Sequence, residues 1–505
     1  MACLTTSLAR IARTSPSTVS AVRLLSTTPA CYLPPKKAAA AVRTQGPKRA
    51  IVQKKGGPVK PGRRGGWGSF SFNRDNIPGI EEEADLSGIP EFSPSVLSPD
   101  AVGQLHQYDR SFLQSITQVW GRPTGGENAV FPLTVPRKLT LDLATRLDAN
   151  KTDGFADQKI LLNGGSGCGK SVLMFQTVAH AMQTGWLVMY IPRGFIHVNS
   201  KYAFHHSSKT QTFHQPSLSA SLLESFIKSQ SNHELLSRIS LVKDHVFTPD
   251  LPAGTGTKTD TEVTLGAVAM EHEVKGNAGK SGKKAQQEGR RRTLVDLCKL
   301  GVDNLGVSVQ VLETVIEILS KQKEIPFLFA LDCAQAYFGA SEYKTPENHR
   351  LESYHLSVPR LFLDYISGRK DFTSGTFLLS LSASQTDSPI TRSLLAGLSL
   401  HTEQQPLKSQ SGKFGGSFSP SYYPPSSSDG EQGGLKKWHV EHAKELKVLD
   451  VPDGMTVGEA KGLWEVKVVK KSLHMVNSDE HFLTKYVEAG GNPREFFRGI
   501  NYTTQ

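Results

Sequence analysis

Residues 164–171 contain the feature that most restricts the fold of this chain, the sequence GGSGCGKS. It satisfies the pattern G-x-x-x-x-G-K-[ST]. It also follows the apolar run 160–162, which we predict to be a buried strand, and precedes a helical pattern that begins at Val172. A P-loop requires this context. The alternative is a glycine-rich turn without a ligand, but such a turn does not need Lys170 and Ser171 after its last glycine.

The motif predicts a role for each residue of the loop. Its glycines let the backbone curl so that N–H groups point at a phosphate, and the positive end of the following helix adds to the same field. Lys170 is predicted to reach the β- and γ-phosphates, and Ser171 to offer its hydroxyl to Mg²⁺. The predicted nucleotide-binding residues are Gly164, Gly165, Ser166, Gly167, Cys168, Gly169, Lys170 and Ser171.

A second apolar strand, predicted over 326–331, ends at Asp332. The parallel strand beside a P-loop strand presents a carboxylate to Mg²⁺, so we predict that Asp332 and Ser171 bind the metal. A turn aspartate at a strand end is the alternative. Cys333 follows, where many ring-forming P-loop ATPases have a glutamate that polarises water, and this lowers the expected turnover. Gln335 is the remaining catalytic candidate, because a glutamine orients water in some GTPases.

A third apolar strand, predicted over 375–382, leads to Ser384. A polar residue after this strand lies beneath the γ-phosphate in such folds, so Ser384 is a further candidate for nucleotide contact. Further strands are predicted at 186–191 and 446–449. We predict helices over 101–120, 139–147, 170–183, 216–240, 305–322, 356–367, 456–469 and 479–489, with a final short helix after Asn492. The valines of 466–469 also suit a strand.

The basic charge of the chain is concentrated at its N-terminus. The net charge is +11, and residues 1–74 contain fourteen Lys or Arg and no Asp or Glu. Residues 1–30 are basic, rich in Ser and Thr, and amphipathic, which is typical of a mitochondrial transit peptide; an ordinary disordered tail is the alternative. Residues 31–79 continue as a Pro- and Gly-rich basic arm that we expect to be disordered alone and to order on a polyanion such as rRNA.

The arm ends in three aromatic residues, Trp67, Phe70 and Phe72. They are predicted either to stack on bases or to anchor the arm on the body of the protein. Five cysteines without C-x-x-C spacing indicate neither a zinc site nor a disulfide framework. No apolar run is long enough to span a bilayer, so we expect a soluble or peripheral protein without a membrane partner.

The order of the motifs resembles the family of mitochondrial small-subunit ribosomal proteins called death-associated protein three. The resemblance runs from about residue 130 to the end of the chain. The segments that carry it are 160–171, 185–192, 213–216, 331–339, 384–386 and 491–493. The insertions 252–292 and 403–437 depart from the family pattern, and their roles cannot be carried over. A role in cell death is doubtful for so divergent a chain.

The resemblance implies an α/β fold of the P-loop NTPase, AAA-like class, with a parallel sheet flanked by helices. The predicted layout is a nucleotide-binding domain over 80–450, interrupted by both insertions, and a small C-terminal helical lid over 451–505. The family implies bound GTP or GDP, with ATP possible, and Mg²⁺. It also implies contacts with small-subunit rRNA, with neighbouring mitochondrial ribosomal proteins, and with the large subunit through an intersubunit bridge.

Three functions stay open at this point. The leading hypothesis is a structural component of the mitochondrial ribosome, in the matrix, whose nucleotide stabilises the core. The first alternative is an active P-loop NTPase that remodels or signals, which requires turnover that Lys170→Ala abolishes. The second is an RNA-binding scaffold with a vestigial P-loop, which would purify without nucleotide.

Overall fold

The computed structural model describes residues 86, 88–121, 132–153, 159–250, 263–266, 291–400, 436–470, 473 and 476–501. The chain divides into two compact units, Met1–Pro78 and Gly79–Gln505, and all described residues belong to the second. The predicted transit peptide, the basic arm with its aromatic residues, and most of both insertions lie outside the described residues.

The described residues alternate between strands and helices along the chain. The α-helices are α1 (Arg110–Val119), α3 (Lys138–Asp153), α4 (Lys170–Gln183), α5 (Pro216–Lys228), α6 (Gln230–Arg238), α7 (Leu294–Asp303), α8 (Ser308–Lys321), α9 (Ser357–Ile366), α10 (Arg392–Gly397), α11 (Lys437–Ala443), α12 (Val457–Val469), α13 (Asp479–Glu488) and α14 (Pro493–Asn501). Short 3-10 helices are η2 (Pro99–Ala101), η3 (Gly194–His197), η4 (Ala334–Phe338) and η5 (Ser353–His355).

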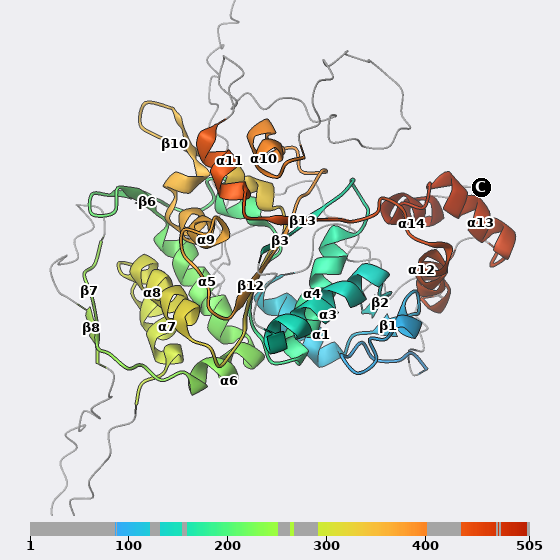
Figure 1. The fold of residues 1–505 in the computed structure, drawn as a ribbon, viewed down its shortest axis with the longest axis horizontal. Helices are drawn as coiled ribbons and strands as arrows, with labels where there is room; N and C mark the ends of the chain where they lie inside the picture. Colours follow the sequence, from blue (N-terminus) through green and yellow to red (C-terminus); the bar gives the residue numbers. More distant parts are fainter. Residues whose placement is uncertain are drawn as a thin grey trace, which may run out of the picture. The chain divides into compact units, whose positions relative to one another are not determined.

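Five parallel strands form the central sheet, in the spatial order β13-β3-β12-β9-β4. Figure 1 labels β13, β3 and β12 at the centre of the molecule. Their bounds are β3 (Lys159–Asn163), β4 (Leu187–Ile191), β9 (Phe327–Leu331), β12 (Gly375–Ser380) and β13 (Lys447–Asp450). Leu161 lies opposite both Leu379 and Val448, and Phe329 lies opposite both Phe377 and Met189. The predicted α/β class, with a parallel sheet flanked by helices, is confirmed.

Helices cover both faces of this sheet. On one face, Phe175 of α4 contacts Tyr190 of β4, with ring centroids 6.1 Å apart. On the other, Phe329 of β9 stacks on Phe362 of α9 at 4.1 Å. Tyr190 pairs with Ala330, so these two side chains point to the same face of the sheet. Phe329, the residue before Ala330, points to the opposite face, because successive side chains of a strand alternate between faces. Burial on both faces explains why β4, β9 and β12 are buried throughout and mostly apolar.

Several predicted elements have different bounds in the structure. The predicted helix 101–120 is wrong in its first half: α1 begins only at Arg110, because the Asp109 side chain caps it by accepting from the Phe112 amide at 2.8 Å. The predicted helix 216–240 is two helices, α5 and α6, separated at Ser229, which is extended. Residues 466–469 are helical, so the strand alternative for them is wrong.

Small antiparallel sheets, which the sequence did not predict, surround the central one. Their strands are β1 (His106–Gln107) with β2 (Leu133–Thr134), β5 (His205–Ser207) with β6 (Thr212–His214), β7 (His245–Phe247) with β8 (Val263–Leu265), and β10 (Ala340–Lys344) with β11 (Arg350–Glu352). Strand β8 lies within the segment 252–292, which was predicted to be a loop. Helix α7 was also not predicted.

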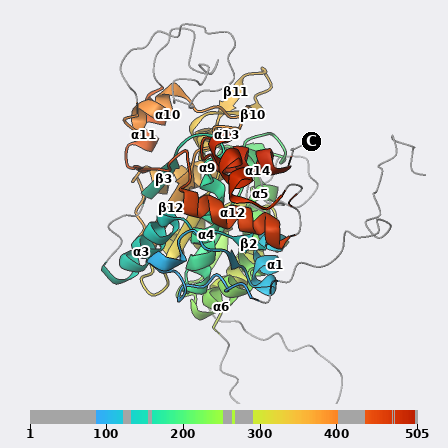
Figure 2. The same cartoon turned by 90° about the vertical axis from the view of Figure 1, so that its right-hand side faces the viewer.

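The last three helices, α12, α13 and α14, form what we call the C-terminal module. They lie together on one side of the central sheet, away from α7 and α8 (Figures 1 and 2). The module has a small hydrophobic cluster of its own, whose buried members are Met455, Ala460, Trp464, Phe482, Phe496 and Ile500. Thr456 and Glu459 form the predicted capping box at the start of α12. Within the described residues, we find no helix with the length and hydropathy that a bilayer span needs.

Candidate functional site

The glycine-rich loop, residues 164–169, connects the carboxyl end of β3 to the N-terminus of α4. Strand β3 ends at Asn163 and α4 begins at Lys170, with Gly169 as its N-cap at φ 95°. This left-handed conformation disfavours residues other than glycine. The loop therefore lies at the edge where the parallel strands end and where the amide groups of a helix N-terminus are exposed, which is where α/β sheets bind ligands.

Two glycines of the loop leave no room for a side chain. A Cβ atom on Gly165 would collide with Asp453 Oδ1, and one on Gly167 would lie 2.7 Å from Arg494 Cβ. Gly167 also has φ 83°, so a side chain there would be strained in any surroundings. Both neighbours come from the chain after β13, so the C-terminal part of the protein covers one side of the loop.

The carbonyl oxygens of the loop accept hydrogen bonds from a ring of donors. Lys170 Nζ donates to Gly164 O at 2.8 Å and to Gly165 O at 2.6 Å. The Lys170 side chain lies within the loop, and the residue is only 7% exposed. The next three carbonyls, of residues 166, 167 and 168, accept from Asn492 Nδ2 at 3.0 Å, the Arg494 amide at 3.3 Å and Arg137 Nη1 at 2.7 Å. Donors from three parts of the chain thus fix the shape of the loop.

The start of α14 contacts the loop through side chains as well. Arg494 Nη1 donates to Ser166 Oγ at 2.7 Å, and its Nη2 to Ser384 Oγ at 3.4 Å. Before α12, Asp453 Oδ1 accepts from the Gly165 amide at 2.7 Å. Arg494 brings a positive charge to the outside of the loop, and it links Ser166 to the turn after β12 that contains Ser384.

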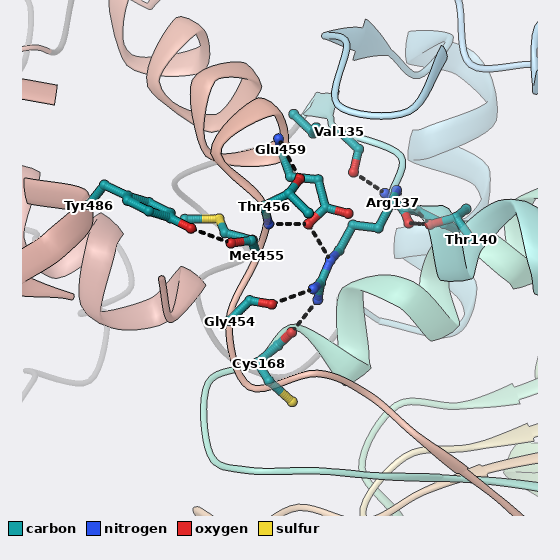
Figure 3. Close-up of polar contacts among 10 residues, drawn as sticks. Val135, Arg137, Thr140, Cys168, Gly454, Met455, Thr456, Glu459 and Tyr486 are labelled. Atoms are coloured by element: carbon teal, nitrogen blue, oxygen red, sulfur yellow. Dashed lines mark hydrogen bonds and ion pairs between the residues drawn. The ribbon is translucent and has the colours of Figure 1, made fainter. Parts of the chain in front are cut away.

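Arg137, immediately before α3, joins the loop to the C-terminal module (Figure 3). Its guanidinium donates to Cys168 O, to Gly454 O at 3.2 Å and to Glu459 Oε2 at 3.3 Å. Glu459 also accepts from the Thr456 amide at 2.9 Å, so one carboxylate serves both the ion pair and the cap of α12. The Arg137 and Glu459 side chains are 13% and 7% exposed, and this ion pair is therefore largely removed from water.

Asp332 is buried at the carboxyl end of β9, as predicted, and is 1% exposed. The prediction that its strand lies beside β3 is wrong, because β12 intervenes. Ser380, the last residue of β12, pairs with Leu162 of β3 and donates its hydroxyl to Asp332 Oδ1. The Cys333 amide donates to the same oxygen at 2.8 Å. Ser380 thus connects the end of β3, the strand before the glycine-rich loop, to Asp332, the predicted metal ligand.

The backbone around Asp332 is tightly constrained. Cys333 is buried in the left-handed region at φ 59°, a conformation that is costly for a residue with a side chain and that occurs at functional sites. Nearby, η3 and η4 pack through His197 and Tyr337, whose Nδ1 and hydroxyl are 2.6 Å apart. Burial lowers the pKa of His197 to about 3 and raises the pKa of Tyr337. Both groups are therefore neutral at pH 7 and share one hydrogen bond.

The other predicted site residues, Gln335, Ser384 and Ser171, differ in burial and in their hydrogen-bond partners. Gln335 is buried, and both ends of its amide bind the Ser382 backbone: Nε2 donates to the carbonyl at 2.9 Å and Oε1 accepts from the amide at 3.0 Å. Ser384 is exposed in the turn after β12, and Ser171 lies in the first turn of α4. The structure thus gathers the loop, Ser171, Ser384 and Asp332 at the carboxyl ends of neighbouring strands. The binding roles of all of these residues stay predictions.

Arg137, Asp453, Arg494 and Ser380 were not predicted to belong to the site. Asn492 was predicted as the N-cap of the final helix, which is confirmed, because its Oδ1 accepts from the Arg494 amide, but its contact with the loop was not predicted. One signal was present in the first turn of the final helix. A positively charged side chain is unfavourable near a helix N-terminus. Arg494, the second residue of α14, is therefore expected to bind a group outside its own helix. No local feature of the sequence indicates that Asp453 contacts Gly165, which lies more than 280 positions earlier in the chain.

Comparison with known proteins gives one family match and two relatives. The family model described as mitochondrial ribosomal death-associated protein 3 matches residues 134–499. The small ribosomal subunit protein mS29 of Neurospora crassa is 21% identical over 343 residues, which cover 66% of this chain. The protein of the same name from Schizosaccharomyces pombe is 23% identical over 364 residues, or 72% of this chain. The matched region spans 62% of the length of each relative.

Proposed function

The chain belongs to the family of mitochondrial ribosomal death-associated protein 3, and on that premise we propose that it is a structural component of the small subunit of the mitochondrial ribosome. Both relatives carry the name of a small ribosomal subunit protein. The proposal places the chain in the mitochondrial matrix, in contact with small-subunit rRNA and neighbouring ribosomal proteins. It includes a contact with the large subunit through an intersubunit bridge.

We further propose that the glycine-rich loop is a P-loop that binds a purine nucleotide, GTP or GDP. The observation that carries this proposal is the hydrogen bonding of the loop. Its carbonyl oxygens, from Gly164 to Cys168, all accept from protein donors. A loop held by its carbonyls can offer amides to an anion, as phosphate-binding nests do. The Gly165 amide already donates to the Asp453 carboxylate, so the proposal relies on the other amides of the loop. The strand order supports the same fold class, since β3 and β9 end at one edge of the sheet with β12 between them.

The residues present fit a magnesium nucleotide. Lys170 carries a positive charge into the loop, Arg494 places a second one beside Ser166, and Ser171 and Asp332 are the oxygen donors that Mg²⁺ prefers. When bound, the metal would neutralise phosphate charge. The protein residues hold the loop, position the carboxylate through Ser380 and the Cys333 amide, and bury Lys170.

A stabilising role follows from the place of the loop between the sheet and the C-terminal module. A ligand that binds only the folded protein adds about 2.7 kcal/mol at a hundred times its dissociation constant. The module contacts the loop through Asp453, Asn492 and Arg494. A nucleotide in the loop would therefore strengthen the attachment of the module, and turnover is not needed for this.

An active NTPase is the competing hypothesis. Cys333 stands where a catalytic glutamate would follow Asp332, and both ends of the Gln335 amide bind Ser382. Gln335 would have to break these two hydrogen bonds to orient a water molecule. These observations favour binding over turnover.

The test is to release nucleotide from the purified chain by heat and identify it by chromatography. We expect about one guanine nucleotide per wild-type chain. Lys170→Ala should bind nucleotide about a hundredfold more weakly, because it removes the cation that reaches the phosphates. The control Lys228→Ala, whose side chain is 60% exposed on α5, should bind nucleotide like the wild type. Wild-type protein free of nucleotide under saturating GTP and ATP would indicate a scaffold with a vestigial loop. Turnover that Lys170→Ala abolishes would favour the enzyme. Co-sedimentation with mitochondrial small ribosomal subunits tests separately whether the chain is a component of the ribosome.

A further inference from the structure

Two histidines and one aspartate converge at the β5–β6 hairpin, apart from the glycine-rich loop. His205 on β5 and His214 on β6 are directly paired across the hairpin. Asp250 lies three residues after β7, and its amide donates to Gly306 O at 3.0 Å, just before α8. Three separate segments therefore bring the three side chains together.

The distances among these side chains suit a single metal ion. One ligand atom from each residue lies within 4.8 Å of the other two. The shortest ion-pair distance is 3.4 Å, between His214 Nδ1 and Asp250 Oδ2. Two ligands at the usual zinc distances are about 3.3 Å apart in a tetrahedral site. The His214 and Asp250 atoms already have about that separation, and the His205 ligand atom lies within 4.8 Å of both.

The hydrogen-bond partners of His214 are compatible with a lone pair on Nδ1 that faces Asp250. Its Nε2 lies 2.9 Å from Thr210 Oγ1, which itself lies 2.7 Å from Thr212 Oγ1. We assign the proton to Nε2, which donates to Thr210, while the Thr210 hydroxyl donates to Thr212. Nδ1 then faces a carboxylate oxygen with its lone pair. Metal-binding histidines characteristically donate their other ring N–H in this way.

The other two groups have atoms that are free to bind a metal. His205 Nε2 and Asp250 Oδ2 are buried atoms without a hydrogen-bond partner among the described residues. In the tautomer assigned to His214, the imidazole nitrogens and the carboxylate oxygen present lone pairs to one another, and a cation between them would remove the repulsion. The His214 side chain is 3% exposed and that of Asp250 is 17% exposed, so solvent reaches the cluster mainly on the Asp250 side.

We propose that His205, His214 and Asp250 bind one divalent first-row transition-metal ion, with zinc as the probe. The ligands are His205 Nε2, His214 Nδ1 and Asp250 Oδ2, and water completes a tetrahedral shell. The ion ties the β5–β6 hairpin to the segment before α8. This inference does not depend on nucleotide binding.

The experiment measures zinc affinity and stoichiometry of the full chain in buffer that contains Mg²⁺, by competition with a chromophoric chelator and by elemental analysis. We expect one zinc per wild-type chain and at least about a hundredfold weaker binding in His205→Gln and Asp250→Asn, since each removes a direct ligand. The matched control is His206→Gln. His206 is the neighbouring residue on β5, is exposed, and contacts Phe213 instead, so its variant should bind like the wild type.

A second variant tests the proposed tautomer. Thr210→Val removes the acceptor of the His214 N–H without touching a ligand, and should weaken binding by about 10- to 100-fold. Far-UV circular dichroism checks that each variant folds, and Co²⁺ substitution should give the absorption bands of a tetrahedral ion. The proposal is overturned if the folded wild type retains no zinc, or if His205→Gln and Asp250→Asn bind as tightly as His206→Gln.

Discussion

The sheet body and the C-terminal module are held together by different forces. The body surrounds five strands whose side chains are covered on both faces, and aromatic contacts such as Phe329 on Phe362 lie at its centre. The module buries only six hydrophobic residues in its own cluster. Its attachment to the glycine-rich loop is polar and runs through Arg137, Asn492 and Arg494. A small hydrophobic contact adds to it elsewhere, where Val466 of α12 is buried with residues of the body (Leu105, Leu133 and Val135).

This difference indicates where the protein can respond to a ligand. Apolar cores tolerate little rearrangement, whereas hydrogen bonds and ion pairs at a half-buried boundary can be exchanged for bonds to another group. The proposed nucleotide site lies at the boundary between body and module. We therefore expect substitutions in the body to lower global stability, and substitutions at the boundary to release the module first.

The largest effect should come from the centre of the body. Phe329→Ala removes a fully buried ring from β9 and should lower the free energy of unfolding by about 3–5 kcal/mol. The contrasting variant is Phe496→Ala, in the module, which should abolish hydrogen-exchange protection of α12–α14 and leave the urea transition of the body in place. Should both variants shift the whole transition equally, body and module would be one cooperative unit.

The same contrast explains what could be predicted from the sequence. Four of the body strands were predictable, because four apolar runs bounded by polar residues leave little choice, and the capping box marked α12. The fifth, β13, was only a weak prediction, because the strand contains Lys447 and is only partly buried. The neighbour of β3 was predicted wrongly, since strand order depends on crossovers and not on local pattern. Arg137 and Asp453 act through contacts with residues hundreds of positions away, and nothing near them in sequence indicates those partners. Ser380, one of several serines near the end of β12, was indistinguishable from Ser384.

The second largest effect should come from Arg137. Arg137→Gln leaves Glu459 largely buried without its cation, and breaking such a pair costs about 3 kcal/mol. We expect the loss to appear as faster hydrogen exchange in α12 and α14, with little change in β9 and β12. Arg137→Lys is the matched control. It keeps the charge but lacks the planar fork that reaches Cys168, Gly454 and Glu459 together, so it should recover only part of the protection.

A smaller effect is expected from Asn492. Its side chain donates to Ser166 O and accepts from the Arg494 amide at 3.0 Å, which caps the start of α14. Asn492→Ala removes these bonds and a third, which Oδ1 accepts from the Glu495 amide at 3.3 Å. The loss should cost about 1–2 kcal/mol, the usual range for a lost N-cap. Exchange should rise in α14 alone and fall back when nucleotide is added, if the nucleotide strengthens the attachment. Unchanged exchange in α14 would show that Asn492 does not hold the helix on the loop.

The smallest effect concerns pH and separates the module from the body. Burial, and then the neighbouring charge of Lys467, lower the pKa of Lys470 at the end of α12 to about 8, against an ordinary value of 10.5. Between pH 8 and 10.5 the unfolded chain therefore binds more protons than the folded one, and the stability of the module rises with pH. Because Lys470 is only half-buried, water screens its charge, and the gain should stay below about 1 kcal/mol. Hydrogen exchange in α12 and α14, corrected for intrinsic rates, should slow over this window in the wild type. In Lys470→Gln this slowing should be absent, whereas an equal change in both proteins would assign the pH dependence to another group.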